Sequence, residues 1–393
     1  MSRPIDLDAN ATTTPTPAVV TAVTRALTEL SHNPSSVHRA GQAARHAVEL
    51  ARKQVADLIG AKPRDVLFTS GGTEAIELAI RGTKPGASTP GFEPPLLVTT
   101  RTEHSAVREL AESLAASKAC FVEWLPLNRG LVDLDALARV LALRPWIVSI
   151  QWANNETGII QPVEKIAELC REVGVLFHCD GTQWVGKMPV AFGEGGLPFD
   201  LLSFSPHKFH GPKGVGVLYV RRGVRFRPTL VGSQELGRRG GTENVPGILG
   251  AGEAAAEAAA WLADPAGRAK GERLRDRFER AVLAACPEAE VNGASVPRLW
   301  NTSNIAFPRL EAEALLMALS EKGVWASAGA ACSSGSLDPS PVLLAMGVPV
   351  PQAHGSLRFS LSRLSTEEEV DAAAAIVVGV VRAQYEVAGK VLG

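Results

Sequence analysis

Short apolar segments alternate with helical segments along the first 220 residues, and this alternation constrains the fold more than any other feature of the sequence. The strand-like segments cover 65–69, 96–100, 121–125, 146–151, 175–179, 201–204 and 215–220. Apolar residues at helical spacing predict helices between them, over 74–81, 105–117 and 163–173, and two before them, over 17–30 and 37–59. This order predicts an α/β fold with a mostly parallel sheet and one antiparallel edge strand.

Around residue 250 the pattern changes to an α+β type. An Ala/Glu-rich helix is predicted over 251–262, broken at Pro265, and further helices over 271–286, 311–322 and 366–385. Short strands are predicted over 304–307 and 357–360. We therefore expect an N-terminal arm (1–15) that joins the small domain, a large α/β domain (16–250) and a small α+β domain (251–393).

Composition excludes several classes of protein. With 40 Lys and Arg against 41 Asp and Glu, the net charge is −1, which is unlike the basic character of nucleic-acid-binding proteins. No apolar run approaches the ~20 residues that span a bilayer, and the N-terminus lacks an apolar signal region. Five sparse cysteines form neither a disulfide framework nor a Cys-x-x-Cys metal pair. We expect a cytoplasmic protein with reduced thiols, no metal site, and no membrane or nucleic-acid partner.

The segment 203–214 connects two predicted strands and holds hydroxyls, two histidines and two lysines. A strand connection needs only Gly or Pro and some polarity. A partly buried Lys208 would lose its proton more easily and could act as a nucleophile, for example toward a carbonyl cofactor. The alternative is an ordinary solvated loop lysine, and the segment alone does not decide between the two.

Three strand-to-helix junctions carry candidate ligand-binding residues. The segment 69–74 places two glycines between a strand and a helix, where N–H groups can bind a phosphate, although an ordinary turn with a Thr cap is the alternative. Asp180 ends a predicted strand, where a carboxylate can hold a pyridine nitrogen protonated or simply cap a helix. His104 can lie against a bound ring or be structural.

Further polar residues follow in the chain. Asn154 and Asn155 precede a glycine turn, where they serve either the turn or a ligand. Arg358 is the single charge of a small predicted strand, and its guanidinium can clamp a carboxylate or form a structural salt bridge.

One cysteine differs from the others in its surroundings. Cys332 lies within 327–336, where every other residue is Ala, Gly or Ser, which suits a nucleophile on a flexible loop. A structural cysteine normally lies in an apolar run. We expect the other four cysteines to be packing residues: Cys120, Cys170, Cys179 and Cys286.

Together these motifs resemble the class V aminotransferase family of pyridoxal-phosphate enzymes, and within it the cysteine desulfurases of the NifS/IscS type. The resemblance runs from Asp8 to Leu361, and its most specific parts are 69–74, 102–104, 154–158, 207–214 and 239–244. It implies a fold-type I pyridoxal-phosphate transferase fold. One departure lies near the nucleophile, where Ala330 replaces the usual serine.

The resemblance also implies a role for each matching residue. Lys208 would bind pyridoxal 5'-phosphate covalently, Asp180 would pair with its ring nitrogen, His104 would stack on the ring and Gln183 would bond its phenolic oxygen. The phosphate would be held by Gly72, Thr73, Ser205 and His207, with Thr242 reaching the phosphate of a neighbouring subunit, so that a homodimer is expected. Asn155 and Arg358 would bind the substrate carboxylate. Cys332 would take the sulfur of L-cysteine as a persulfide, with His104 assisting, and L-alanine would leave.

Three functions compete on this evidence. The first is cysteine desulfuration with transfer of sulfur to an unidentified protein acceptor, for iron–sulfur cluster or thio-cofactor synthesis. The second is another class V pyridoxal-phosphate enzyme, such as an aminotransferase or selenocysteine lyase. The third is a non-catalytic sulfur carrier or partner subunit. Cys332 favours the first function because aminotransfer needs no thiol, and Lys208, His104 and Asp180 argue against the third.

Overall fold

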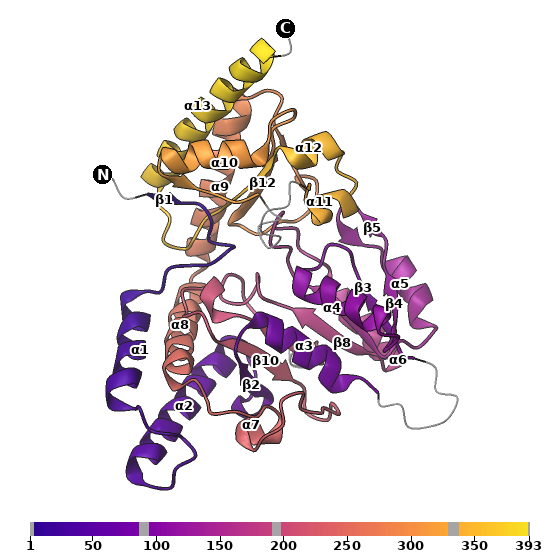
Figure 1. Cartoon of the computed structure of the whole chain (residues 1–393), viewed down its shortest axis with the longest axis vertical. Coiled ribbons are helices and arrows are strands. Elements are labelled where there is room, and N and C mark those ends of the chain that lie inside the picture. The colour runs from indigo at the N-terminus through magenta and orange to yellow at the C-terminus, as the bar shows by residue number, and fades with distance from the viewer. Residues whose placement is uncertain (1–3, 86–93, 191–197, 329–337, 392–393) are drawn as a thin grey trace.

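The computed structural model describes residues 4–85, 94–190, 198–328 and 338–391, with the side chains of 388–391 left out. Cys332 and Ala330 therefore lie outside the described residues. Figure 1 shows a lower body built around one large sheet and an upper body that contains the C-terminal helix. The N-terminal arm runs up into the upper body.

The large sheet has seven strands in the order β2-β10-β9-β8-β7-β3-β4. Their bounds are Val66–Thr69 (β2), Leu96–Thr99 (β3), Phe121–Trp124 (β4), Ile147–Gln151 (β7), Leu176–Asp180 (β8), Leu201–Phe204 (β9) and Gly216–Val220 (β10). Five neighbouring strands, from β9 to β4, are parallel. β10 is antiparallel to both β9 and β2.

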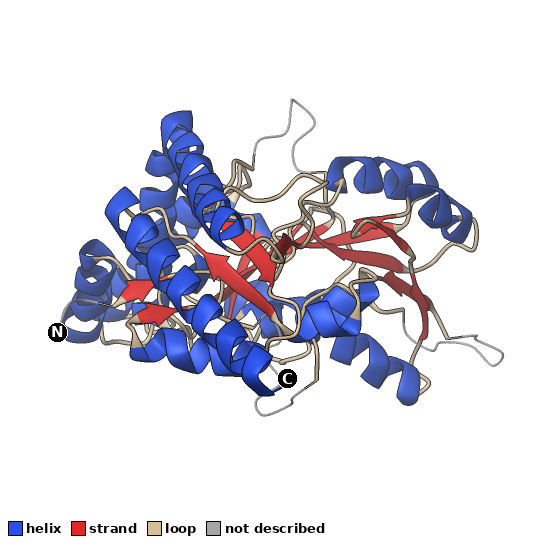
Figure 2. Ribbon diagram, turned by 90° about the horizontal axis from the view of Figure 1, so that it is seen from above, coloured by secondary structure: helices blue, strands red, loops and turns tan. Residues whose placement is uncertain are grey.

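Both faces of this sheet are covered by helices, as Figure 2 shows from above. The helices are Pro17–Glu29 (α1), Arg39–Leu58 (α2), Gly72–Thr83 (α3), Ser105–Ala116 (α4), Leu134–Leu141 (α5), Val163–Val173 (α6), Gln234–Gly237 (α7) and Val245–Ala263 (α8). Successive strand residues point to opposite faces. Leu202 accordingly packs in the cluster of α1, α2, α5, α6 and α8, and Leu201 in the cluster of α3 and α4. Burial on both faces explains the uninterrupted apolar character of these strands.

The C-terminal part contains a three-stranded antiparallel sheet, β11-β12-β14, and a short pair, β1-β13. The strands are Ile5–Asp6 (β1), Glu290–Val291 (β11), Thr302–Ala306 (β12), Val324–Trp325 (β13) and Ser356–Ser360 (β14). The helices are Pro265–Ala285 (α9), Ala312–Glu321 (α10), Pro341–Ala345 (α11), Val350–His354 (α12) and Glu367–Val391 (α13). Because β1 pairs with β13, the arm adds a strand to this part of the molecule.

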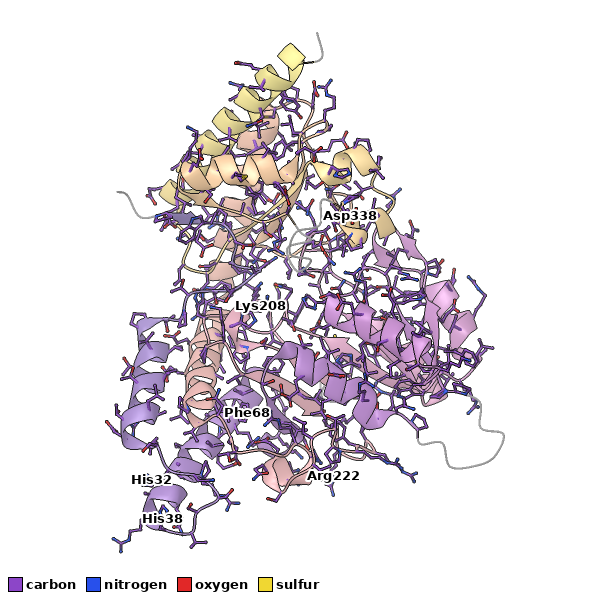
Figure 3. The ribbon with its side chains drawn as sticks, viewed as in Figure 1. His32, His38, Phe68, Lys208, Arg222 and Asp338 are labelled. Carbon is purple, nitrogen blue, oxygen red and sulfur yellow. The ribbon has the colours of Figure 1, made fainter. Side chains whose placement is uncertain are left out.

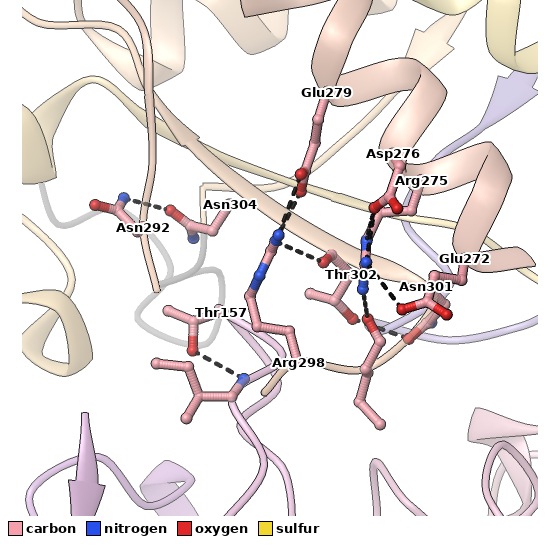
Figure 4. A network of polar contacts seen from close by, with 12 residues as sticks. Thr157, Glu272, Arg275, Asp276, Glu279, Asn292, Arg298, Asn301, Thr302 and Asn304 are labelled. Atoms are coloured by element: carbon pink, nitrogen blue, oxygen red, sulfur yellow. Dashed lines mark hydrogen bonds and ion pairs between the residues drawn. The ribbon is translucent and has the colours of Figure 1, made fainter. Parts of the chain in front are cut away.

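Ion pairs fasten α9 to the segment that leads into β12 (Figure 4). Arg298 binds both carboxylate oxygens of Glu279 at 2.7 and 3.1 Å, and only 9% of its side chain is exposed. Arg275 donates to the Leu299 carbonyl at 2.6 Å. These contacts hold Asn301 and Thr302 in place beside the N-terminal arm.

The structure corrects three predictions. The antiparallel strand β10 is not an edge strand, because β2 pairs with its outer side. α8 begins at Val245 rather than 251, since the Asn244 side chain caps it. α9 begins at Pro265 rather than 271, because Pro265 takes the first helical position behind the Asp264 cap. The domain boundary predicted at residue 250 lies within α8, and the division stays a prediction.

Candidate active site

A cavity of about 260 Å³ lies where the parallel strands end. Chain segments that leave the carboxyl ends of β3, β7, β8 and β9 supply His104, Asn155, Asp180 and Ser205, which is the usual place for a ligand in an α/β sheet. Figure 3 places Lys208 between the sheet and the upper body. Ten predicted site residues line this cavity: Gly72, Thr73, His104, Asn155, Asp180, Gln183, Ser205, His207, Lys208 and Arg358.

Lys208 ends a 3₁₀ turn, Pro206–Lys208, directly after β9. Its amine donates to the carbonyl oxygens of Asn10 and Ala11, both at 2.8 Å. The N-terminal arm therefore holds the lysine over the strand ends, and the side chain is not an ordinary solvated loop lysine. Burial, and then the charges of Lys208 and Arg358, lower the pKa of the neighbouring Lys187 well below its usual range.

The N-terminus of α3 forms one wall of the cavity. Gly71 occupies the cap position with extended backbone and offers no side-chain cap, so the first N–H groups of the helix stay available to an anion. Ser205 lies beside Gly72, His207 lines the same cavity, and the His207 ring contacts the Thr12 hydroxyl at 3.0 Å. Burial and the charge of Lys208 lower the pKa of His207 to about 4, so its ring is neutral at pH 7.

Asp180 and His104 stand on the sheet side of the cavity. Asp180 is 5% exposed and accepts a bond from the Thr182 N–H at 3.0 Å. His104 caps α4 by accepting at Nδ1 from the Ala106 N–H at 3.1 Å, so that Nε2 carries the proton of the neutral ring. Burial lowers the pKa of His104, which keeps the ring neutral at pH 7.

Arg358 reaches the cavity from β14. Its Nη2 donates to Asp8 Oδ1 at 2.7 Å and its Nη1 to the Asn155 carbonyl at 3.1 Å. Its buried Nε has no hydrogen-bond partner within the described part of the chain. The guanidinium thus forms the salt bridge that was one of the two alternatives from the sequence, and Arg358 also lines the cavity.

Two predicted residues are not in this cavity. Thr242 is exposed and lines a separate cavity of about 210 Å³ with Arg239 and Asn244. Arg239 binds Glu74 of α3 at 2.8 Å, which ties the Thr242 loop to the helix that forms the cavity wall. Cys332 lies outside the described residues. Before that gap, Ser327 pairs with Arg358, and after it Ser340 donates to Glu156, so both flanking segments lie beside the cavity.

The sequence reasoning missed several residues that shape the site. Asp8 and Asn10 come from the N-terminal arm, and their partners lie more than 140 residues away along the chain. Glu103 is buried against Thr100 and the Gln151 N–H, and burial raises the pKa of its carboxyl well above its usual range. In the sequence, Asp8 and Asn10 belong only to the first segment of the family resemblance, which gave neither residue a role. No local pattern around Lys187 predicts that this lysine is buried beside the cavity.

The remaining four cysteines are buried, as predicted. Burial raises the pKa of all four thiols, that of Cys170 to about 12. Among the residues the structure describes, no three His, Cys, Asp or Glu side chains form a group that could hold a metal ion. None of the helices in the described ranges is long and apolar enough to cross a membrane.

The chain matches the family Aminotransferase class-V over residues 5–373. It is 47% identical to a cysteine desulfurase of Trichormus azollae over 369 residues, which is 93% of this chain and 90% of the relative. It is 44% identical to the cysteine desulfurase NifS of Azotobacter vinelandii, covering 93% and 89% of the two chains. A solved NifS-like protein superposes with a TM-score of 0.86 at 34% identity, over 96% of this chain and 99% of the other.

The chain belongs to the class V aminotransferases, a family of α/β enzymes that generally use pyridoxal phosphate. Within that family it belongs to the cysteine desulfurases. The predicted fold type and enzyme class are therefore confirmed. The aminotransferase, selenocysteine lyase and sulfur-carrier alternatives are not favoured.

Proposed function

We propose that this chain converts L-cysteine and the Cys332 thiol into L-alanine and a Cys332 persulfide. The carbon–sulfur bond of cysteine breaks, and its electron pair remains with the carbon, which takes a proton. The Cys332 thiolate supplies the pair for the new sulfur–sulfur bond. One observation carries the proposal: an amine, a carboxylate, a neutral imidazole and an uncapped helix N-terminus meet in one cavity.

These residues fit pyridoxal 5'-phosphate. The first N–H groups of α3 at Gly72 and Thr73, with Ser205 and His207, would hold the phosphate. Asp180 would pair with the ring nitrogen, His104 would lie on the ring and Lys208 would bind the aldehyde carbon. When bound, the cofactor supplies an electron sink for the substrate.

Residues of the protein would transfer protons and bind the substrate. Lys208 would take and return protons at the substrate carbon, and Asn155 and Arg358 would hold the substrate carboxylate. A free cysteine with a pKa of ~8.5 is mostly protonated at pH 7, so Cys332 needs a base. We propose His104 as that base: its ring is neutral, and it would take the proton at Nδ1 after releasing the Ala106 N–H that Nδ1 now accepts.

We further propose a homodimer in which Thr242 reaches the partner's cofactor phosphate. Val231 and Leu236, in the segment that leads to Thr242, are 88% and 75% exposed, and burying such apolar side chains favours association. The sulfur would pass from Cys332 to a protein acceptor in the cytoplasm, for iron–sulfur cluster or thio-cofactor synthesis.

The test is to incubate the purified protein with pyridoxal phosphate and L-cysteine and to measure alanine and sulfide together. Equal release of both in the presence of a thiol reductant supports the proposal, whereas pyruvate or an amino-group acceptor requirement contradicts it. Borohydride reduction followed by peptide mapping should attach the cofactor to Lys208. An adduct on Lys213, or on no lysine, would refute that assignment.

A further inference from the structure

Lys187 is a buried lysine that the proposed chemistry does not use. Only 5% of the residue is exposed, and its amine contacts no carboxylate in the described part of the chain. It donates instead to two amide oxygens, Gln183 Oε1 at 2.5 Å and Asn10 Oδ1 at 2.7 Å. Burial, and then the charges of Lys208 and Arg358, lower its pKa well below the usual range. A lysine kept there at such a cost calls for an explanation.

The lysine determines which way the Gln183 amide faces. A side-chain amide has an acceptor end and a donor end, and the Lys187 amine donates to the acceptor end of Gln183 and of Asn10. The Gln183 oxygen must therefore face Lys187, and its nitrogen faces the other way, where it donates to the Asn10 carbonyl at 3.0 Å. That same carbonyl accepts a bond from Lys208.

The surroundings of Asn10 make this arrangement self-consistent. Its amide oxygen accepts from Lys187 and from Asn301 at 3.0 Å. Its nitrogen donates to the Asn155 carbonyl at 3.1 Å and to the Thr302 hydroxyl at 2.9 Å. Figure 4 shows Asn301 and Thr302 held in turn by the contacts that fasten α9. Reversing either amide would place like groups against each other.

The Gln183 nitrogen carries two hydrogens, and one is used by Asn10. The second has no other partner among the residues that the structure describes. Gln183 lines the cavity, so this N–H is a donor available to whatever binds there.

We propose that Lys187 is a positioning residue, which fixes the Gln183 amide so that its N–H, and not its oxygen, faces the phenolic oxygen of bound pyridoxal phosphate. The inference rests on the proposed function. Without Lys187 the amide is free to turn its oxygen toward the anionic phenolic oxygen, which would lose a hydrogen bond and gain a repulsion. Gln183 is the group that touches the cofactor, and Lys187 acts through it.

The test uses the pH dependence of the visible absorption of the bound cofactor, which responds to donors at the phenolic oxygen. Lys187→Met keeps the length of the side chain and removes its donors. A phenolic oxygen that has lost this hydrogen bond is more basic and attracts the proton on the Lys208 nitrogen more strongly. The pH at which the visible absorption changes should therefore move upward. A hydrogen bond to a charged group corresponds to about one to two pH units.

A double-mutant cycle separates positioning from a general structural effect. Gln183→Leu should produce the same upward shift, and adding Lys187→Met to it should produce no further shift. The surface variant Lys165→Met is the control and should titrate like the wild type. Gln183→Glu keeps an acceptor for Lys187 but lacks the N–H, so it should also shift upward.

Five outcomes are decisive. An upward shift that does not add in the double variant supports the inference. A Lys187→Met protein that unfolds at lower temperature but titrates like the wild type overturns it, as do additive shifts. If Lys187→Met does not fold, an unshifted Gln183→Glu protein overturns the inference. A wild-type protein that binds no pyridoxal phosphate refutes the proposed function as well, so the two failures are distinguishable.

Discussion

Replacing Arg358 by lysine should weaken binding of the substrate carboxylate without removing the positive charge. The guanidinium has two nitrogens engaged, by Asp8 and by the Asn155 carbonyl, and a buried Nε without a described partner. Lysine offers one point charge and cannot bind Asp8, the Asn155 carbonyl and a substrate carboxylate in the fork geometry of arginine. We therefore expect the loss of about one hydrogen bond to a charged group, or ~1.5–3 kcal/mol.

At ~1.4 kcal/mol per factor of ten, this loss corresponds to a KM for L-cysteine raised about 10- to 100-fold. The assay is alanine formation over a range of cysteine concentrations. Arg298→Lys is the control, because the Arg298 side chain is also largely buried, at 9% exposed against 3% for Arg358, and is paired with Glu279 but does not line the cavity. If Arg358→Lys leaves KM unchanged in a folded protein, Arg358 is only the structural partner of Asp8 and the assignment is wrong.

Two further predictions concern stability. Burial lowers the pKa of His178 to about 4 in the folded protein, while a histidine in the unfolded chain has a pKa of ~6.5. Between pH ~4 and pH ~6.5 the unfolded state therefore binds more protons than the folded state. The free energy of unfolding should therefore fall by about 3 kcal/mol as the pH drops from ~6.5 to ~4, and it should fall less in His178→Asn. Urea titrations at several pH values measure this, and an equal loss of stability in the wild type and in His178→Asn would refute it. Arg52 binds Glu235 at 2.6 Å with both side chains buried, so Arg52→Met should cost ~3–5 kcal/mol, whereas the exposed control Arg25→Met should cost under ~1 kcal/mol.

Local patterns identified most of the elements because these elements are long or strongly apolar. The uninterrupted strand Leu201–Phe204 and the amphipathic helix Val163–Val173 could be predicted from spacing alone. Two-residue strands at Leu127–Asn128 and Leu131–Val132 (β5 and β6) are too short to leave a period, and the helix α5 that follows them was missed as well. The order of strands in a sheet depends on pairing between distant segments, which is why the antiparallel strand was expected at the edge and not, like β10, inside the sheet.

The same distinction between local patterns and distant pairing applies to the residues of the site. Residues at strand ends, such as Asp180 and Lys208, could be predicted because parallel strands bring their carboxyl ends together. The salt bridge of Arg358 joins residues 350 positions apart, and no local pattern encodes that pairing. Lys187 reads as one more surface lysine until its burial is known, since its partners are two amides and not a carboxylate.

The central claim is that Cys332 takes the sulfur of cysteine, and peptide mass spectrometry after turnover with L-cysteine tests it most directly. Free thiols are blocked at the end of the reaction, and each cysteine-containing peptide is examined for an added sulfur atom. We predict a persulfide on Cys332 alone, and none in Cys332→Ser, which should still bind pyridoxal phosphate but release no sulfide. A persulfide on one of the buried cysteines, such as Cys179, or undiminished sulfide release by Cys332→Ser, would contradict the account.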